Sequence, residues 1–208
     1  MRAENRTIGQ SASFIEAARR AQIMTAAIET VNEVGYHRAS LAQIASRAGI
    51  AKSIISYHFA SKENLLLFVV NDVFARMDAA TGAAARTGAD PAARLAAYLR
   101  AYLAFVRDHR EETIAAVEIA ISHRDADGTP LYLAESEPET ALLEGIISDG
   151  IASGQFCDVD LTVARTTLIH ALDGGLTRSQ MDARTDLDTY GDHLVPMLLA
   201  GLGYRPDG

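Results

Sequence analysis

Hydrophobic positions along most of the chain recur at intervals of three and four residues, and few stretches alternate apolar and polar residues. The first spacing is that of an amphipathic α-helix, whereas alternation is that of a half-buried strand. Proline, glycine and capping serine or aspartate residues divide the pattern into segments of helical length. The sequence therefore predicts an all-α fold of about nine helices, which we place at 14–34, 41–48, 51–58, 62–85, 91–108, 111–122, 138–154, 160–178 and 187–202.

The segment SLAQIASRAGIAKSIISYHFASK, residues 40–62, predicts two short helices joined by a tight turn. Ser40 and Gln43 have the spacing of a capping box at the start of the first helix. Gly49 suits the left-handed backbone conformation that ends it. In the second helix Ile55 takes an inward position, and small polar or cationic residues take the outward ones. This pattern is typical of a helix-turn-helix, whose second helix enters the major groove of DNA.

The charge is distributed unevenly. The whole chain has a net charge of −8, yet residues 1–62 hold eight Lys or Arg against four acidic residues, while the remainder holds eleven against 23. Both lysines of the chain, Lys52 and Lys62, lie in the cationic part. Such asymmetry favours a cationic contact module on an acidic body, with chance clustering as the alternative. Arg19 and Arg20, which we place near the start of the first helix, oppose its dipole there and favour an anionic partner nearby.

The segment SLAQIASRAGIAKSIISYHFASKENLL, preceded by a long helix that ends at Gly35-Tyr36, resembles the TetR family of bacterial one-component transcription regulators. The resemblance implies a homodimer whose N-terminal three-helix modules bind successive major grooves of a palindromic DNA operator. It also implies a larger helical domain that binds a small-molecule effector, which releases the protein from DNA. We accordingly expect a DNA-binding domain at 1–62, with 1–13 as a flexible arm, and a ligand-binding and dimerisation domain at 63–208.

The resemblance also implies roles for individual residues. The expected phosphate contacts are Ser40, Tyr57, His58 and Lys62, and the residues expected to face base edges are Lys52, Ser53 and Ile54. Many family members have an aromatic residue where this chain has Ser56, so that contact is either absent or made by a shorter hydroxyl. Packing at the corner of the module is the alternative for Tyr57 and His58, and a plain capped helix start is the alternative for Lys62.

Candidate ligand-binding residues come from the larger domain. Tyr98, Tyr102 and Phe105 form a stripe at helical spacing, while Glu118, His170 and Asp173 interrupt apolar stretches of later helices. A polar group buried in such a stretch needs a partner or a ligand. Together these six residues favour an effector with some polar character. Core packing remains the alternative for the aromatic residues, and exposure or an interface position for the others.

The last two helices are apolar around more than one face, although a surface helix needs only one apolar stripe. The excess predicts a homodimer through these helices in a four-helix bundle, in which Gly174-Gly175 would let two helices approach closely.

Other functional classes find little support. The histidines are scattered, and we find no glycine-rich phosphate loop, HExxH segment or nucleophile elbow, so we expect neither an enzyme nor a cofactor or metal. The single cysteine, Cys157, suits the cytoplasm, and no stretch approaches the ~20 apolar residues of a membrane span. The sequence thus favours a ligand-responsive repressor. The alternatives are a helical DNA-binding protein without an effector and a helical enzyme.

Overall fold

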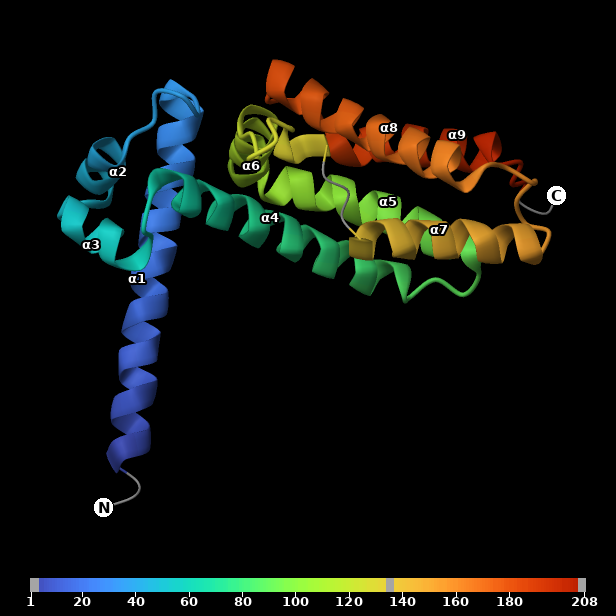
Figure 1. Ribbon diagram of the computed structural model, residues 1–208. Coiled ribbons are helices and arrows are strands. Elements are labelled where there is room, and N and C mark those ends of the chain that lie inside the picture. Colours follow the sequence, from blue (N-terminus) through green and yellow to red (C-terminus); the bar gives the residue numbers. More distant parts are fainter. Residues whose placement is uncertain (1–3, 134–136, 206–208) are drawn as a thin grey trace. The chain divides into compact units, whose positions relative to one another are not determined.

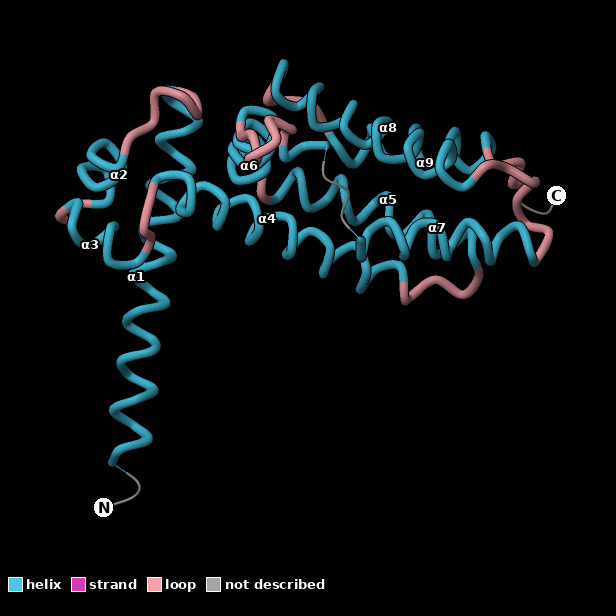
Figure 2. The backbone as a smooth tube through the Cα atoms, viewed as in Figure 1, coloured by secondary structure: helices cyan, strands magenta, loops and turns pink. Residues whose placement is uncertain are grey.

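A computed structural model describes residues 4–133 and 137–205 of the chain (Figure 1). The regular structure of these residues consists of nine α-helices and one short 3-10 helix, and the backbone tube in Figure 2 shows helices joined by loops. The elements are α1 (Glu4–Val34), α2 (Leu41–Ala48), α3 (Lys52–His58), α4 (Lys62–Ala85), α5 (Pro91–Asp108), α6 (Arg110–Ser122), η1 (Leu131–Leu133), α7 (Glu137–Ala152), α8 (Leu161–Met181) and α9 (Leu187–Gly201). The predicted all-α fold is confirmed, and none of these helices is long and apolar enough to cross a membrane.

The main difference from the predicted elements lies at the start of α1. The helix begins at Glu4 rather than near Phe14, so that residues 4–13 of the expected arm are helical, and residues 1–3 lie outside the described part. The segment contains no proline, and extending an existing helix fixes one residue for each hydrogen bond gained. Arg19 and Arg20 therefore lie in the middle of a helix, where the argument from the helix dipole does not apply.

The chain divides into two compact units. The first comprises the residues up to Val73 together with Ala115–Tyr132, and the second comprises Phe74–Ile114 and the residues from Leu133 onward. The first unit is thus larger than the domain expected at 1–62. The start of α4 belongs to it because Leu65, Leu66 and Val69 are fully buried there.

The core of the first unit brings α1, α2, α3 and α4 together. Ile23, Ala27 and Val31 supply the apolar face of α1, and Ile44 and Ile55 are the fully buried residues of the two short helices. Because α2 packs against both α1 and α3, the outward face of α3 is held on a rigid base.

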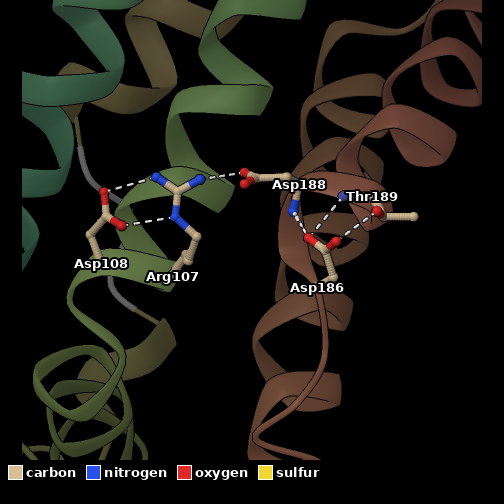
Figure 3. Close-up of polar contacts among 5 residues, drawn as sticks. All are labelled: Arg107, Asp108, Asp186, Asp188 and Thr189. Carbon is tan, nitrogen blue, oxygen red and sulfur yellow. Dashed lines mark hydrogen bonds and ion pairs between the residues drawn. The ribbon is translucent and has the colours of Figure 1, made fainter.

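In the second unit α5 packs against α7, α8 and α9. Its residue Leu103 lies against two glycines, since a Cβ at Gly175 would approach its side chain to 2.8 Å and one at Gly191 to 3.0 Å. At the end of α5 the guanidinium of Arg107 lies between Asp108, 2.8 Å from its Nε, and Asp188 of α9 (Figure 3). Hydrogen bonds from Thr189 lower the pKa of Asp186, which caps α9 beside this ion pair.

Candidate nucleic-acid interface

The local geometry of α2 and α3 is that of the helix-turn-helix expected from the sequence. The Ser40 hydroxyl accepts a hydrogen bond from the Gln43 N–H at 3.3 Å and lies 2.7 Å from the Gln43 side-chain oxygen. Gly49 has a φ of 65°, the left-handed conformation that the turn requires. Ile55 of α3 is fully buried, so the opposite side of this helix is available for contact.

The α3 residues expected to contact DNA are all at least partly accessible. Lys52, Ser53, Ser56 and Tyr57 are exposed, and Ile54 and His58 are half-buried. Tyr57 is 81% exposed, and its ring packs edge-on against His58 at 5.1 Å between centroids. An aromatic side chain with so little cover suits a contact surface better than a packed corner. The hydroxyl of Ser56 donates to the Lys52 carbonyl at 3.3 Å.

Lys62 has a structural partner that the sequence pattern did not indicate. Its ammonium group donates to the Tyr36 carbonyl oxygen at 2.9 Å and lies 4.9 Å from the centroid of the same tyrosine's ring. The start of α4 is capped independently, because the Ser61 hydroxyl accepts from the Asn64 N–H at 3.1 Å. The ammonium group therefore joins the start of α4 to the end of α1.

Glu118, one of the expected ligand-binding residues, contacts Tyr36 as well. The Tyr36 N–H donates to Glu118 Oε1 at 2.8 Å, and the Tyr36 hydroxyl lies 3.0 Å from Nδ1 of His123. Burial raises the pKa of Tyr36. Glu118 thus belongs to the first unit and has a backbone N–H as its partner, so it does not join Tyr98 and Tyr102 in the second unit.

The other expected ligand residues lie in the second unit and are only partly brought together. Tyr98, Tyr102 and Phe105 are buried, and the Tyr102 hydroxyl donates to Asp173 at 3.2 Å. His170 is exposed, and its Nδ1 lies 2.8 Å from the Thr166 carbonyl oxygen of its own helix. The second unit therefore holds fewer buried candidate ligand residues than expected, because His170 lies on the surface of the unit.

Sequence reasoning missed Glu139 of α7, whose Oε1 accepts from the Tyr98 hydroxyl at 2.6 Å. Burial raises the pKa of Glu139, and the neighbouring carboxylates Asp78 and Asp173 raise it further, although the hydrogen bond from Tyr98 opposes this. Burial also raises the pKa of Tyr98. The interior of the second unit therefore combines two tyrosine hydroxyls with carboxyl groups and disfavours a further negative charge.

The apolar residues of α8 and α9 are mostly covered within the subunit. Leu168, Leu172 and Val195 are each no more than 2% exposed. Gly174 and Gly175 face side chains of the same chain, since a Cβ at either would lie 3.2 Å from the ring or hydroxyl of Tyr190. The close helix approach expected at these glycines is found within the subunit, where α5 and α9 occupy the space beside them.

A smaller apolar surface remains on these helices. Val163, Met181 and Met197 are 64%, 75% and 63% exposed, respectively. Met197 also lines a groove of 540 Å³ together with Arg178, Tyr190 and His193. Among the described residues, no group of three or more His, Cys, Asp or Glu side chains is placed to hold a metal ion.

Comparison with known proteins finds a matching family model and similar chains. The model of the bacterial regulatory proteins of the TetR family matches residues 23–69, which include the whole helix-turn-helix. The fatty acid metabolism regulator protein of Bacillus subtilis (strain 168) is 25% identical over 189 residues, which cover 87% of this chain and 94% of that protein. The HTH-type transcriptional regulator BetI of Escherichia coli is 41% identical over 63 residues, but these are only 32% of its length.

Solved structures match over nearly the full length. The fatty acid degradation regulator FadR of Bacillus halodurans has a TM-score of 0.77 at 23% identity and is covered over 97% of its chain. FadR of Bacillus subtilis, determined in complex with stearoyl-CoA, has a TM-score of 0.76 at 24% identity and is covered over 98%. The two structures share the fold of this chain.

Proposed function

Because the chain belongs to the TetR family of bacterial DNA-binding transcriptional regulators, we propose that it represses transcription by binding a palindromic operator as a homodimer. A small-molecule effector releases it. The protein is a regulator and not an enzyme. The single observation that carries the proposal is the exposed face of α3, which is built on a buried Ile55 within the residues that the family model matches. An operator-binding role places the protein in the cytoplasm, where the chromosome lies.

In this proposal α3 reads the operator from the major groove. Lys52, Ser53 and Ile54 face base edges, where lysine can donate to guanine and an apolar side chain can contact the thymine methyl group. Ser40, Tyr57 and His58 hold the flanking phosphates, which fix register without reading sequence. The Ser56 hydroxyl, which already has an acceptor in its own helix, makes at most a short contact.

The homodimer forms through the part of α8 and α9 that the subunit leaves uncovered. Exposed apolar side chains such as Val163 and Met197 favour a partner, and a second copy would present the same patch. Two recognition helices must reach grooves about 34 Å apart, so dimer geometry determines whether both bind at once. An effector that favours another separation of the helices shifts the population away from the DNA-bound state.

The effector proposed is a long-chain acyl thioester. The structure of Bacillus subtilis FadR in complex with stearoyl-CoA supports this class, as does the similarity to the fatty acid regulator of that organism, which extends over 94% of that protein. The interior chemistry favours a thioester over a free fatty acid, since a carboxylate beside Glu139 and Asp173 would meet like charges. A thioester carbonyl is uncharged and therefore avoids this repulsion.

The experiment measures binding to a labelled duplex from the promoter region upstream of the protein's own gene. We expect salt-sensitive binding that is tighter than to a scrambled duplex, release by stearoyl-CoA, and no release by stearate or coenzyme A. Equal affinity for both duplexes would contradict operator recognition. Binding that none of the three compounds weakens would favour the DNA-binding protein without an effector.

A further inference from the structure

A second polar surface lies beside the recognition helix, and of the residues that line it only His58 takes part in the contacts described above. It is a hollow of 340 Å³ in the first unit, between α1, the end of α3 and the first turns of α4. Its polar lining comes from Arg20, His58, Asn64 and Asn71, and its apolar lining includes Phe59 and Phe68. No acidic residue of the described chain is among those that line it.

Arg20 is held in this hollow by aromatic rings rather than by a carboxylate. Its guanidinium carbon lies 5.0 Å from the ring centroid of Phe59 and 4.7 Å from that of Phe68. The two rings pack together at 5.3 Å. Ring contacts of this kind fix a guanidinium and leave N–H donors at its edge available for a planar or tetrahedral oxyanion.

The surroundings of Arg20 differ from those of its neighbour Arg19. Nη1 of Arg19 donates to the Gln22 side chain at 2.7 Å, and that glutamine in turn donates to the Ala48 carbonyl. Arg20 has no carboxylate or carbonyl acceptor among the described residues, and the amide side chains of Asn64 and Asn71 lie at the same hollow. The hollow thus has hydrogen-bond donors of Asn64 and Asn71 around the positive charge of Arg20.

The position of the hollow beside the end of α3 indicates which anion it would bind. His58 is the last residue of α3, and Asn64 is in the first turn of α4, where the helix dipole also favours negative charge. A recognition helix in the major groove has the DNA backbone at its ends, and phosphates there are bound by arginine, asparagine and helix N-termini. A guanidinium in this place is therefore suited to a backbone phosphate.

We propose that this hollow is a phosphate-binding site for the operator backbone, with Arg20 as its charged ligand and Asn64 as a neutral donor. The inference rests on the proposed DNA-binding function and adds a contact from α1 and α4 to those of α2 and α3. The contact is independent of sequence, so it strengthens binding to any duplex and positions α3 without reading bases.

The test is the salt dependence of duplex binding by the full-length protein, measured by fluorescence anisotropy for Arg20→Gln and the matched control Arg19→Gln. Each phosphate neutralised by the protein contributes about 0.9 to the slope of log K against log salt concentration. Arg20→Gln should lower the slope by about 0.9 for each subunit bound, equally on operator and scrambled DNA. Arg19→Gln, which removes the same charge one residue away, should leave the slope unchanged.

A second variant separates the contact from a structural effect. Asn64→Asp places an acid in the first turn of α4, where it favours the helix, so the thermal midpoint should be kept or raised. The same variant should weaken both duplexes at least tenfold, because it sets a negative charge against the phosphate.

If the Arg20→Gln protein folds and its salt-dependence slope equals that of the wild type, the phosphate site is wrong. If the wild-type protein does not prefer its operator, the proposed function is contradicted instead. The thermal midpoint in the presence of inorganic phosphate tests whether the hollow binds a free anion and not the DNA backbone. Stabilisation of the wild-type protein by phosphate, lost in Arg20→Gln without any change of slope, would overturn the operator assignment.

Discussion

The ammonium group of Lys62 lies 2.9 Å from the carbonyl oxygen of Tyr36, so the first residue of α4 is fixed to the end of α1. Lys62→Met removes this hydrogen bond and the contact with the Tyr36 ring. We expect a loss of about 1.5 kcal/mol in the free energy of unfolding, the lower end of the range for a hydrogen bond to a charged group, because this bond is only partly buried. Urea denaturation measures it.

The same variant should weaken operator and scrambled duplexes to the same extent, because it misplaces a module instead of removing a base contact. Lys62→Arg, which keeps a cation at this position, is the control and should recover part of both losses. A loss confined to the operator duplex would show that Lys62 reads bases.

For Lys52 we expect the opposite result, a loss of base preference without a loss of stability. It is exposed at the start of α3, where a lysine can donate to guanine in the major groove. Lys52→Ala should leave the stability within about 0.5 kcal/mol of the wild type, as is usual for an exposed position. It should reduce the preference for operator over scrambled DNA by about 1–3 kcal/mol in a competition assay. Equal weakening on both duplexes would make Lys52 a phosphate contact.

The sequence predicted those features that depend on neighbouring residues. Ser40 with Gln43 and the left-handed Gly49 are local signals, and each determines its own turn of the helix-turn-helix. The contact between Tyr36 and Glu118 joins residues 82 positions apart, so no periodic pattern could indicate it. Glu118 interrupts an apolar stretch in the way a ligand-binding carboxylate would, and only the fold shows that a backbone N–H is its partner.

The extent of the dimer surface could not be predicted from the sequence for a related reason. Apolar residues on several faces of α8 and α9 indicate that the helices are covered, but the pattern does not tell whether the same chain or another one covers them. Here α5 supplies much of the cover, as the approach of Leu103 to Gly175 shows. Similarly, the partner of Tyr98 could not be predicted, because Glu139 lies on a helix whose inward face the sequence left undefined.

Glu139 should make the stability depend on pH. Burial raises the pKa of this carboxyl above its ordinary value of 4.5, so the folded state binds its proton more tightly than the unfolded state does. The stabilising effect is complete below 4.5 and is lost as the pH rises through the pKa of the folded state.

Glu139→Gln is neutral at every pH, so its stability relative to the wild type should increase with pH and then level off. Urea denaturation across that range measures the difference. Tyr98→Phe removes the hydrogen bond that lowers the Glu139 pKa and should extend the loss to higher pH. A constant difference between Glu139→Gln and the wild type would contradict the assignment.

Met197 tests the proposed dimer surface. It is 63% exposed on α9, and a second copy of the patch would cover it. Met197→Asp places a charge there and should convert dimers to monomers without changing the helix content, as measured by analytical ultracentrifugation and circular dichroism. Ile15→Asp is the matched control, because Ile15 is also 63% exposed but lies on α1. Dimers that persist in Met197→Asp would place the interface elsewhere.

Two glycines of α7 should respond oppositely to the same substitution. A Cβ at Gly150 would lie 2.0 Å from Cδ2 of Phe156, a ring that is itself buried, whereas a Cβ at Gly145 would meet nothing within 4 Å. Gly150→Ala should therefore cost about 1–3 kcal/mol of stability through overpacking. Gly145→Ala should add about 0.5–1 kcal/mol, since alanine loses less backbone entropy in a helix than glycine. Urea denaturation of both variants measures these differences, and equal effects would mean that the Phe156 ring moves aside without cost.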